Sequence, residues 1–261
     1  MSPIGPLVIK LAETRLTDSG VRHLAEHYGA VEWLEKAKQS QPNESEFLIE
    51  IAGRTCYKSF GVGLNPNVTR IRDNSRDYIT NVLEKGDGSI LEHATVTFAF
   101  LNVSRIFTHE LVRHRAGTAI SQESLRYVRP RDIDLWLPPD LEPASKQFHE
   151  TIQEITKHYH DLEALFDWDK MTFEQKKRLT SALRRILPDG IATNIIWTGN
   201  HRTIRWVIEM RTDPSAEVEI RKVFGKVAEI CLQDYPLLYS DFTYKELADG
   251  TRQYVPKFSK V

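Results

Sequence analysis

The chain has 261 residues, of which 41% are hydrophobic and 27% charged, and its formal net charge is -1. This length and composition fit a globular protein with one large domain or two small ones. The near-zero net charge argues against general binding to nucleic acid or to a membrane surface, because both need a basic excess. With only Cys56 and Cys231, no signal-peptide pattern in residues 1–10 and no apolar run approaching ~20 residues, we expect a soluble cytoplasmic protein without a disulfide scaffold.

Apolar residues at helical spacing, together with capping residues, predict that most of the chain is helical. The predicted helices cover residues 20–37 with a break near Gly29, 45–59 with Ser45 as N-cap, 71–85 ended by Gly86, 104–115 capped by Ser104 and ended by Gly117, 143–166, 172–188, 200–211 and 216–233. Thr172-Phe173-Glu174-Gln175 has the form of a capping box. Alternating β-branched and aromatic residues predict a strand over residues 94–102, and another is expected over residues 193–198. This mixture indicates an α+β or mixed α/β fold.

The most informative stretch of the sequence is Arg113-His114-Arg115, which is followed by Ser124-Leu125-Arg126-Tyr127. Cations held so closely repel one another unless anions lie between them, so the cluster indicates a site for phosphorylated ligands. The alternative is a set of solvated charges at the end of a helix, where the helix dipole favours cations by ~0.3–1 kcal/mol. On a helix, Arg113 and Arg115 would point about 200° apart. They would then serve two ligands, or two halves of a site shared between subunits.

Other common kinds of site are not supported by the residue spacing. His109-Glu110 and His114 nearly form the zinc motif His-Glu-x-x-His, but the second histidine is one residue late, so we predict no metal site. Cys56 and Cys231 fit core positions of helices better than a reactive setting. The chain has no Gly-x-Gly-x-x-Gly or Walker loop, so any dinucleotide must be held by side chains.

The helix predicted over residues 200–211 carries further arginines. Arg202 and Arg205 share one face, whereas Arg211 lies near the centre of the apolar face. A buried guanidinium with no acid partner nearby costs several kcal/mol unless something accepts its hydrogen bonds. The acceptor for Arg211 is either a distant carboxylate or a ligand.

Taken together, these blocks resemble the flavin-dependent thymidylate synthases. The family signature is Arg-His-Arg, a spacer of about seven residues and Ser-x-Arg, and here residues 116–123 form a slightly longer spacer. Further blocks match in order: Ser89-Ile90-Leu91-Glu92-His93, Leu111-Val112, Arg184 to Pro188, Asn200-His201-Arg202, Arg211, Ala216 and Glu219-Ile220. The likeness is strongest over residues 45–235 of a single domain that spans residues 1–261.

The resemblance implies a central mixed, largely antiparallel sheet flanked by helices, and a homotetramer with active sites at subunit junctions. It also implies FAD as cofactor, NADPH and methylenetetrahydrofolate as co-substrates, and reductive methylation of dUMP to dTMP. The residues at the family's flavin-binding positions are Ser89, Arg113, His114, Arg115, Gln122, Asn200, His201, Arg202 and Arg205. The residues at its nucleotide-binding positions are Glu110, Leu111, Val112, Arg113, Gln122, Glu123, Ser124, Leu125, Arg126, Arg184 and Arg211.

Arg211 is the residue to which the resemblance assigns catalysis. Hydride that reaches a uracil ring leaves negative charge on its oxygens and nitrogens, and a desolvated guanidinium at the ring edge would stabilise that charge. Ser124 is interpreted as a phosphate-binding hydroxyl, because nothing near it in the sequence would activate it as a nucleophile.

The chain departs from the family at several positions. The family usually has Gln at Glu110, His at Asp87, Asn or His at Arg205 and Gln at Glu217. A carboxylate ~4 Å from a substrate phosphate would cost ~4 kcal/mol at an effective dielectric constant of about 20. Two alternatives therefore stay open: a flavin-dependent C5-methylase of UMP or another pyrimidine nucleotide, and a nucleotide-binding protein without catalysis.

Overall fold

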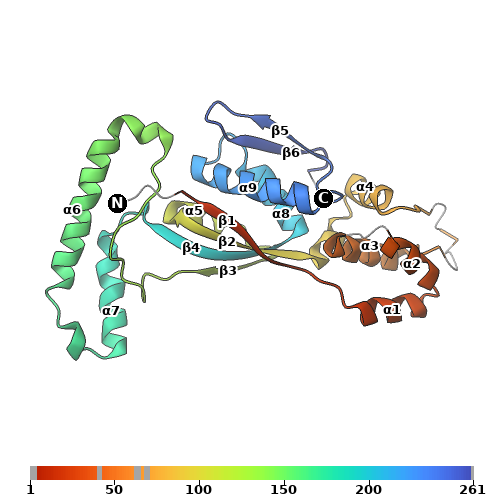
Figure 1. The fold of residues 1–261 in the computed structure, drawn as a ribbon, viewed down its shortest axis with the longest axis horizontal. Coiled ribbons are helices and arrows are strands. Elements are labelled where there is room, and N and C mark those ends of the chain that lie inside the picture. Colours follow the sequence, from red (N-terminus) through yellow and green to blue (C-terminus); the bar gives the residue numbers. More distant parts are fainter. Residues whose placement is uncertain (1–4, 40–42, 62–65, 68–70, 260–261) are drawn as a thin grey trace. The chain divides into compact units, whose positions relative to one another are not determined.

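The computed structural model describes residues 5–39, 43–61, 66–67 and 71–259 (Figure 1). The chain divides into two compact units. Unit 1 comprises Met1–Ile9, Ala99–Arg113 and Ile120–Trp197, and unit 2 comprises Lys10–Phe98, His114–Ala119 and Thr198–Val261. One boundary therefore falls inside the basic cluster, between Arg113 and His114. Because each unit draws on three separate stretches of chain, neither is contiguous in sequence, and the assignment of a single domain stays a prediction.

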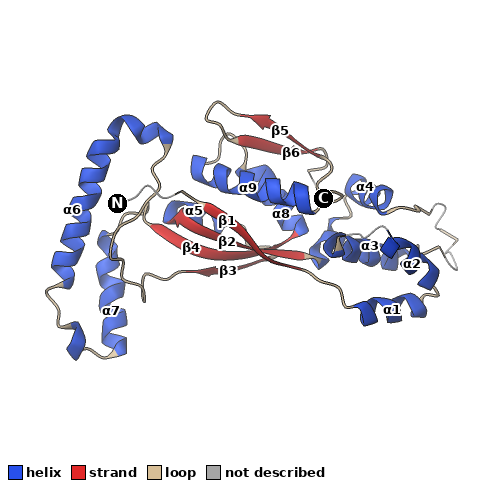
Figure 2. Cartoon of the chain, viewed as in Figure 1, coloured by secondary structure: helices blue, strands red, loops and turns tan. Residues whose placement is uncertain are grey.

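Four strands form the larger sheet: β1 (Leu7–Glu13), β2 (Thr95–Ser104), β3 (Thr118–Gln122) and β4 (Ala192–Asn200). Their order in the sheet is β1-β2-β4-β3 (Figure 2). The strands predicted over residues 94–102 and 193–198 are confirmed as β2 and β4, which are central. The sequence pattern does not predict β1 and β3, because edge strands leave most of their side chains partly exposed and so lack a clear buried face.

A second sheet lies in unit 2 and has two strands, β5 (Phe242–Glu246) and β6 (Arg252–Pro256). They pair antiparallel, with Phe242 opposite Pro256 and Glu246 opposite Arg252. Strand β6 contacts two helices of the same unit, α8 (His201–Arg211) and α9 (Val218–Asp234). Antiparallel sheet together with flanking helices confirms the predicted α+β fold class.

The other helices described in unit 2 are α1 (Asp18–His27), α2 (Val31–Gln39), α3 (Glu44–Tyr57) and α4 (Ser75–Lys85), with a 3-10 helix η1 (Gly88–His93). All four α-helices overlap segments predicted to be helical, but three N-termini differ from the prediction. Helix α1 begins at Asp18, two residues before the predicted start. The N-cap of α3 is Asn43 and not Ser45, because the Asn43 side chain accepts hydrogen bonds from the first backbone N–H groups of the helix. Helix α4 begins at Ser75 instead of residue 71, because Asn74 caps it in the same way.

The helices described in unit 1 are α5 (Arg105–Leu111), α6 (Ser145–Glu163) and α7 (Phe173–Leu183), with 3-10 helices η2 (Pro139–Ala144), η3 (Trp168–Lys170) and η4 (Arg184–Ile186). The predicted capping box is confirmed. The Thr172 N–H donates to Gln175 Oε1 at 2.8 Å, and the Gln175 N–H donates to Thr172 Oγ1 at 3.3 Å. Helices α5 and α7 both end earlier than predicted, the first of them at Leu111 and not near residue 115.

Aromatic packing fixes α5 within unit 1. Phe100 of β2 packs edge-on against Phe107 of α5, with ring centroids 5.5 Å apart, and stacks on Trp197 of β4 at 6.1 Å. All three rings are fully buried, so the helix that leads to Arg113 is held by a large apolar contact.

Among the described residues, no helix combines the length and the apolar character needed to cross a membrane.

Candidate functional site

The basic cluster lies in a turn and not on a helix. Ser104 caps α5 as predicted and accepts a hydrogen bond from the Phe107 N–H at 3.0 Å. Because α5 ends at Leu111, the cluster belongs to the connection between α5 and β3. The Thr118 hydroxyl donates to the carbonyls of His114 and Arg115, at 3.0 and 3.2 Å. The expectation that Arg113 and Arg115 point about 200° apart on a helix is therefore wrong, since no helix holds them.

Gly117 joins this turn to the start of α8 within unit 2. Its φ is 66°, and a Cβ atom there would lie 2.3 Å from Asn200 Nδ2 and 2.6 Å from Thr203 Oγ1. The Asn200 N–H donates to the Gly117 carbonyl at 3.1 Å, and Thr203 Oγ1 donates to the Ala116 carbonyl at 2.8 Å. Only glycine fits this position, and the contact fixes the turn that carries His114 against α8.

His114 and Arg211 form a direct hydrogen bond within unit 2. Arg211 Nε donates to His114 Nε2 across 2.7 Å, although the two residues are 97 positions apart. Nε2 can accept only when it carries no proton, so the imidazole proton is on Nδ1. Burial and the neighbouring charge of Arg211 lower the pKa of His114 to about 4. His114 is therefore neutral near pH 7, and it orients the guanidinium by accepting from its Nε.

The buried arginine of α8 is Arg205 and not Arg211. Arg205 is 3% exposed, whereas Arg211 is only half-buried. The Arg205 guanidinium donates to both carboxylate oxygens of Asp241, at 2.8 and 2.9 Å, and to the carbonyls of Leu238 and Phe258. The expectation that Arg211 is the buried guanidinium is thus wrong. The predicted flavin contact at Arg205 is not supported either, because its donors are used inside unit 2.

The first residues of α8 also serve the fold of unit 2. Asn200 is buried, and its side chain caps α8 by accepting from the Thr203 N–H at 2.9 Å. His201 is fully buried, with Nδ1 lying 3.0 Å from the Tyr239 hydroxyl, and burial with the nearby charge of Arg205 lowers its pKa to about 3. The predicted flavin contact through the His201 side chain is therefore not supported by its surroundings.

Two predicted flavin residues of unit 2 are exposed. Ser89 lies in η1, and Arg202 lies in the first turn of α8. Arg202 Nη1 donates to Glu92 Oε1 at 2.6 Å, so α8 and η1 are linked by an exposed ion pair. Such a pair contributes little to stability, and it can rearrange when a ligand binds.

Unit 1 contains a pair of neighbouring arginines, Arg105 and Arg184, and only Arg184 is among the predicted site residues. Arg105 is the first residue of α5, and Arg184 is the first residue of η4. Burial, and next the charge of Arg184, lower the pKa of Arg105, whereas Asp189 raises it. Arg105 Nη1 is buried and has no hydrogen-bond acceptor among the described residues. An anion bound here would accept a hydrogen bond from this buried donor and reduce the repulsion between the two cations.

The signal for Arg105 is present in the sequence. It directly follows the N-cap residue Ser104, and the positive end of the helix dipole disfavours a cation in the first turn. A basic residue at this position therefore needs a reason other than helix stability.

The end of β3 is tied to its neighbours in unit 1. Gln122 Nε2 donates to Thr108 Oγ1 of α5 at 3.2 Å. Glu123 accepts a hydrogen bond from Asn194 Nδ2 of β4 at 2.9 Å, and its N–H donates to the Asn194 carbonyl at the same distance. Both predicted site residues are thus held in place, one against α5 and the other against β4.

The predicted phosphate-binding residues follow directly after Glu123. Leu125 is buried in an apolar cluster with Ile133, Leu135, Ile152 and Ile191. Its side chain belongs to the core, so only its backbone can face a ligand. The anchored Leu125 fixes its neighbours, the half-buried Ser124 and the exposed Arg126, and Ser124 Oγ accepts from the Arg126 N–H at 3.3 Å.

The last predicted nucleotide-binding residues lie at the end of α5. Leu111 is fully buried, so its side chain serves the core and cannot contact substrate. Glu110 is half-buried, and Val112 and Arg113 are exposed. Arg113 Nε donates to the His109 carbonyl at 3.4 Å.

A family model described as thymidylate synthase complementing protein matches residues 39–237. The flavin-dependent thymidylate synthase of Corynebacterium diphtheriae is 36% identical over 220 residues, which cover 81% of this chain and 84% of that protein. The chain belongs to the flavin-dependent thymidylate synthase family. The family's members from Mycobacterium bovis and Mycobacterium tuberculosis are each 35% identical over 211 residues, which cover 78% of this chain and 82% of theirs. The resemblance drawn from the ordered motifs is confirmed.

The family's name implies a flavin, and part of the expected residue set fits one. Ser89, Arg113 and Arg115 are exposed, and no ion pair among the described residues involves either arginine. Each of these exposed guanidinium groups, Arg113 in unit 1 and Arg115 in unit 2, suits an anionic group of a cofactor. The fit is thus good for the basic cluster and poor for His201 and Arg205, which are enclosed in unit 2.

Proposed function

We propose that the protein catalyses the reductive methylation of dUMP to dTMP, with methylenetetrahydrofolate as carbon donor and NADPH as reductant through FAD. Membership of the family and the names of its relatives, flavin-dependent thymidylate synthases, support this proposal. The observation that carries it is the 2.7 Å bond between Arg211 and His114. That bond joins the family's basic motif to the arginine at the position assigned to catalysis.

Arg211 would stabilise the charge that develops during reduction of the pyrimidine. When bound, FAD would supply the hydride. Negative charge then grows on the carbonyl oxygens of the ring, and an arginine held in a fixed orientation can donate hydrogen bonds to them without first reorganising. His114 provides this orientation, because its neutral Nε2 accepts from Arg211 Nε.

The nucleotide phosphate would be held in unit 1. A phosphate between Arg105 and Arg184 would relieve their mutual repulsion and accept a hydrogen bond from the buried Arg105 Nη1. Ser124 and Arg126 would add a hydroxyl and a further guanidinium. Ser89, Arg113 and Arg115 would hold the flavin.

The proposal includes the homotetramer with active sites at subunit junctions that the resemblance implies. Four chains of 30.1 kDa make an assembly of about 120 kDa, which light scattering coupled to gel filtration measures directly. A monomer that turns over dUMP would contradict this part of the proposal.

The decisive experiment compares dUMP and UMP as substrates of the purified, flavin-loaded protein with NADPH and methylenetetrahydrofolate. We expect methylation of dUMP to be faster, and Arg211→Ala to abolish it while bound flavin per chain stays unchanged. Equal or faster turnover of UMP would favour the ribonucleotide C5-methylase. A colourless protein that takes up no added FAD would favour the nucleotide-binding protein without catalysis.

A further inference from the structure

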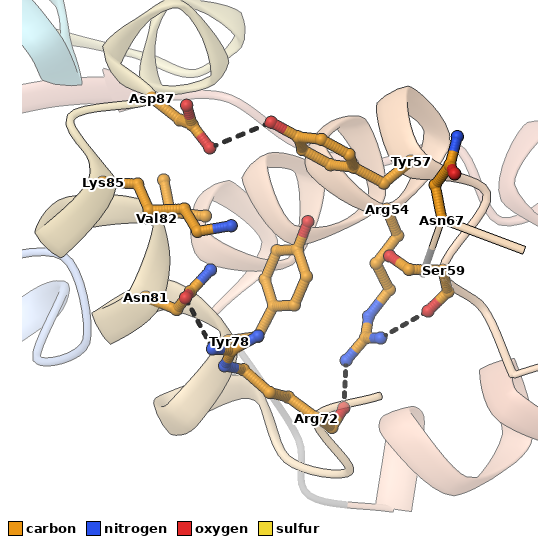
Figure 3. Close-up of a pocket in the computed structure, with 10 residues that line it drawn as sticks. All are labelled: Arg54, Tyr57, Ser59, Asn67, Arg72, Tyr78, Asn81, Val82, Lys85 and Asp87. Carbon is orange, nitrogen blue, oxygen red and sulfur yellow. Dashed lines mark hydrogen bonds between the residues drawn. The ribbon is translucent and has the colours of Figure 1, made fainter. Parts of the chain in front are cut away.

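A pocket of about 380 Å³ lies between α3 and α4 in unit 2 (Figure 3). The described residues that line it include Arg54, Tyr57, Arg72, Lys85 and Asp87. Its volume is in the range of sites for small molecules. The polar and aromatic character of the lining indicates what kind of molecule it would take.

Arg54 holds the two sides of the pocket together. It is 1% exposed, pairs with Glu50 at 2.7 Å and stacks on the Tyr78 ring at 4.4 Å. Its terminal nitrogens donate to the carbonyls of Ser59 and Arg72, at 2.7 and 2.8 Å. Because a buried carboxylate matches its charge and the described chain uses its donors, Arg54 builds the pocket and does not serve as its ligand-binding cation.

Two other cations give the pocket an excess of positive charge. Arg72 donates to the neutral amide of Asn81, and Lys85 Nζ lies 5.9 Å from the centre of the Tyr57 ring. No ion pair among the described residues involves Arg72 or Lys85. Asp87 is the one carboxylate among the described lining residues, and it accepts a hydrogen bond from the Tyr57 hydroxyl at 3.3 Å. The lining thus favours an anion.

Tyr57 provides a flat wall beside these cations. Figure 3 shows its ring extending across the pocket towards Asp87, which holds the hydroxyl. The charge of Asp87 raises the pKa of Tyr57, so the phenol stays neutral near pH 7. The ring is 48% exposed and is therefore open to stacking by a second planar group.

We propose that this pocket binds the anionic end of a co-substrate, namely a phosphate or carboxylate attached to a flat ring. Lys85 and Arg72 would bind the oxyanion, and Tyr57 would stack on the ring. The inference rests on the proposed function, in which two molecules carry this chemistry: NADPH, with a phosphate on its adenosine, and methylenetetrahydrofolate, with carboxylates on its benzoyl tail.

The chain connects the pocket to the predicted flavin site. Asp87 immediately precedes η1, and Ser89 is the second residue of η1. The pocket residue Asp87 is therefore only two residues from Ser89, which is at a flavin-binding position. Both candidate co-substrates must reach the flavin, so this placement suits either of them.

Calorimetric titration of the flavin-loaded protein tests the proposal without relying on turnover. The two probes are adenosine 2′,5′-bisphosphate, for the NADPH end, and p-aminobenzoyl-glutamate, for the folate end. We expect Lys85→Gln and Arg72→Gln each to weaken binding of the same probe about tenfold, as loss of one charged hydrogen bond would. Arg76→Gln is the matched control, because Arg76 is exposed on α4 about 13 Å from Lys85 along the helix axis.

The outcomes separate the two sources of the anion. If the Lys85→Gln and Arg72→Gln variants bind only the bisphosphate more weakly, the pocket is assigned to NADPH. If they bind only the benzoyl-glutamate more weakly, it is assigned to the folate. The proposal is overturned if neither probe binds, or if Lys85→Gln and Arg76→Gln weaken binding equally. Since dUMP methylation is measured separately, a failure here leaves the proposed function standing, and an inactive protein that still binds a probe leaves the pocket standing.

Discussion

Replacement of His114 tests whether this residue positions Arg211 or serves another purpose. His114→Leu keeps apolar bulk in the half-buried site but removes the acceptor for Arg211 Nε. His114→Gln supplies an amide oxygen that can accept in place of Nε2. If orientation of Arg211 is what matters, the glutamine variant should retain much of the activity that the leucine variant loses.

The expected size of the effect follows from the bond. A hydrogen bond to a charged group contributes about 1.5–3 kcal/mol, which corresponds to about 10–150-fold in kcat/KM if the transition state loses all of it. At 2.7 Å, the bond between Arg211 and His114 is at the short end of its class, so we expect a loss in the upper half of that range for His114→Leu. The loss should appear mainly in kcat, because the charge that Arg211 stabilises develops during the reaction.

The assay measures dTMP formation per bound flavin, with flavin content determined from absorbance for each variant. This normalisation matters because His114 also lies at a predicted flavin-binding position. Equal activities of the glutamine and leucine variants would refute the positioning role. So would a loss of flavin with unchanged turnover per remaining flavin, which would make His114 a flavin contact alone.

Three further outcomes follow from the buried charges. Asp241→Asn should leave Arg205 unpaired and lower the free energy of unfolding by about 3–5 kcal/mol, which corresponds to a melting temperature about 6–20 °C lower. The flavin content of the folded protein should stay unchanged. Loss of flavin with an unchanged melting temperature would instead indicate that Arg205 binds the cofactor. Arg105→Met should raise the KM for dUMP about 10–100-fold with little change in kcat, and without ligand its melting temperature should be at least that of the parent protein. A lower melting temperature with an unchanged KM would contradict a phosphate site at Arg105. His114 and His201 have folded pKa values of about 4 and about 3, below the unfolded value of about 6.5. Between about pH 6.5 and pH 4 the unfolded chain therefore binds more protons than the folded one, so the free energy of unfolding should fall as the pH drops, by at most about 1.4 kcal/mol per pH unit for each histidine. Denaturation curves measured at several pH values should show that this free energy depends less steeply on pH in His114→Gln than in the parent protein.

Several features of the fold that depend on local sequence are predicted correctly. The capping box at Thr172, the N-cap at Ser104 and the helix stop at Gly86 all have the expected geometry, because each depends on residues a few positions apart. The central strand β2 is predicted for the same reason: alternation of buried Val96 and Phe98 with polar neighbours is visible in one short segment.

The starts of α3 and α4 are misplaced because other local residues cap them, whereas the larger errors occur where distant contacts decide the structure. Helix α5 stops at Leu111 because the following turn is bonded to Thr118 and packed against Asn200, and the local sequence carries no sign of the second contact. The burial of Arg205 depends on Asp241, which lies 36 residues further along the chain in a segment with no predicted element. The pairing of His114 with Arg211 spans a still longer separation, although motif order alone placed both residues at the site.

The use of each guanidinium's donors separates structural arginines from binding arginines in this chain. Arg105 is the first residue of α5, and Arg205 is the fifth residue of α8. Arg205 donates to Asp241 and to two backbone carbonyls, so the fold itself compensates its burial. Arg105 keeps a buried nitrogen without an acceptor among the described residues and lies near a second cation, Arg184, so the nearby Asp189 offsets its burial only in part and a bound anion would offset it further. A nucleotide phosphate that offsets the cost of burying Arg105 would bind more tightly for that reason. Nucleotide should therefore raise the melting temperature of the parent protein more than that of Arg105→Met.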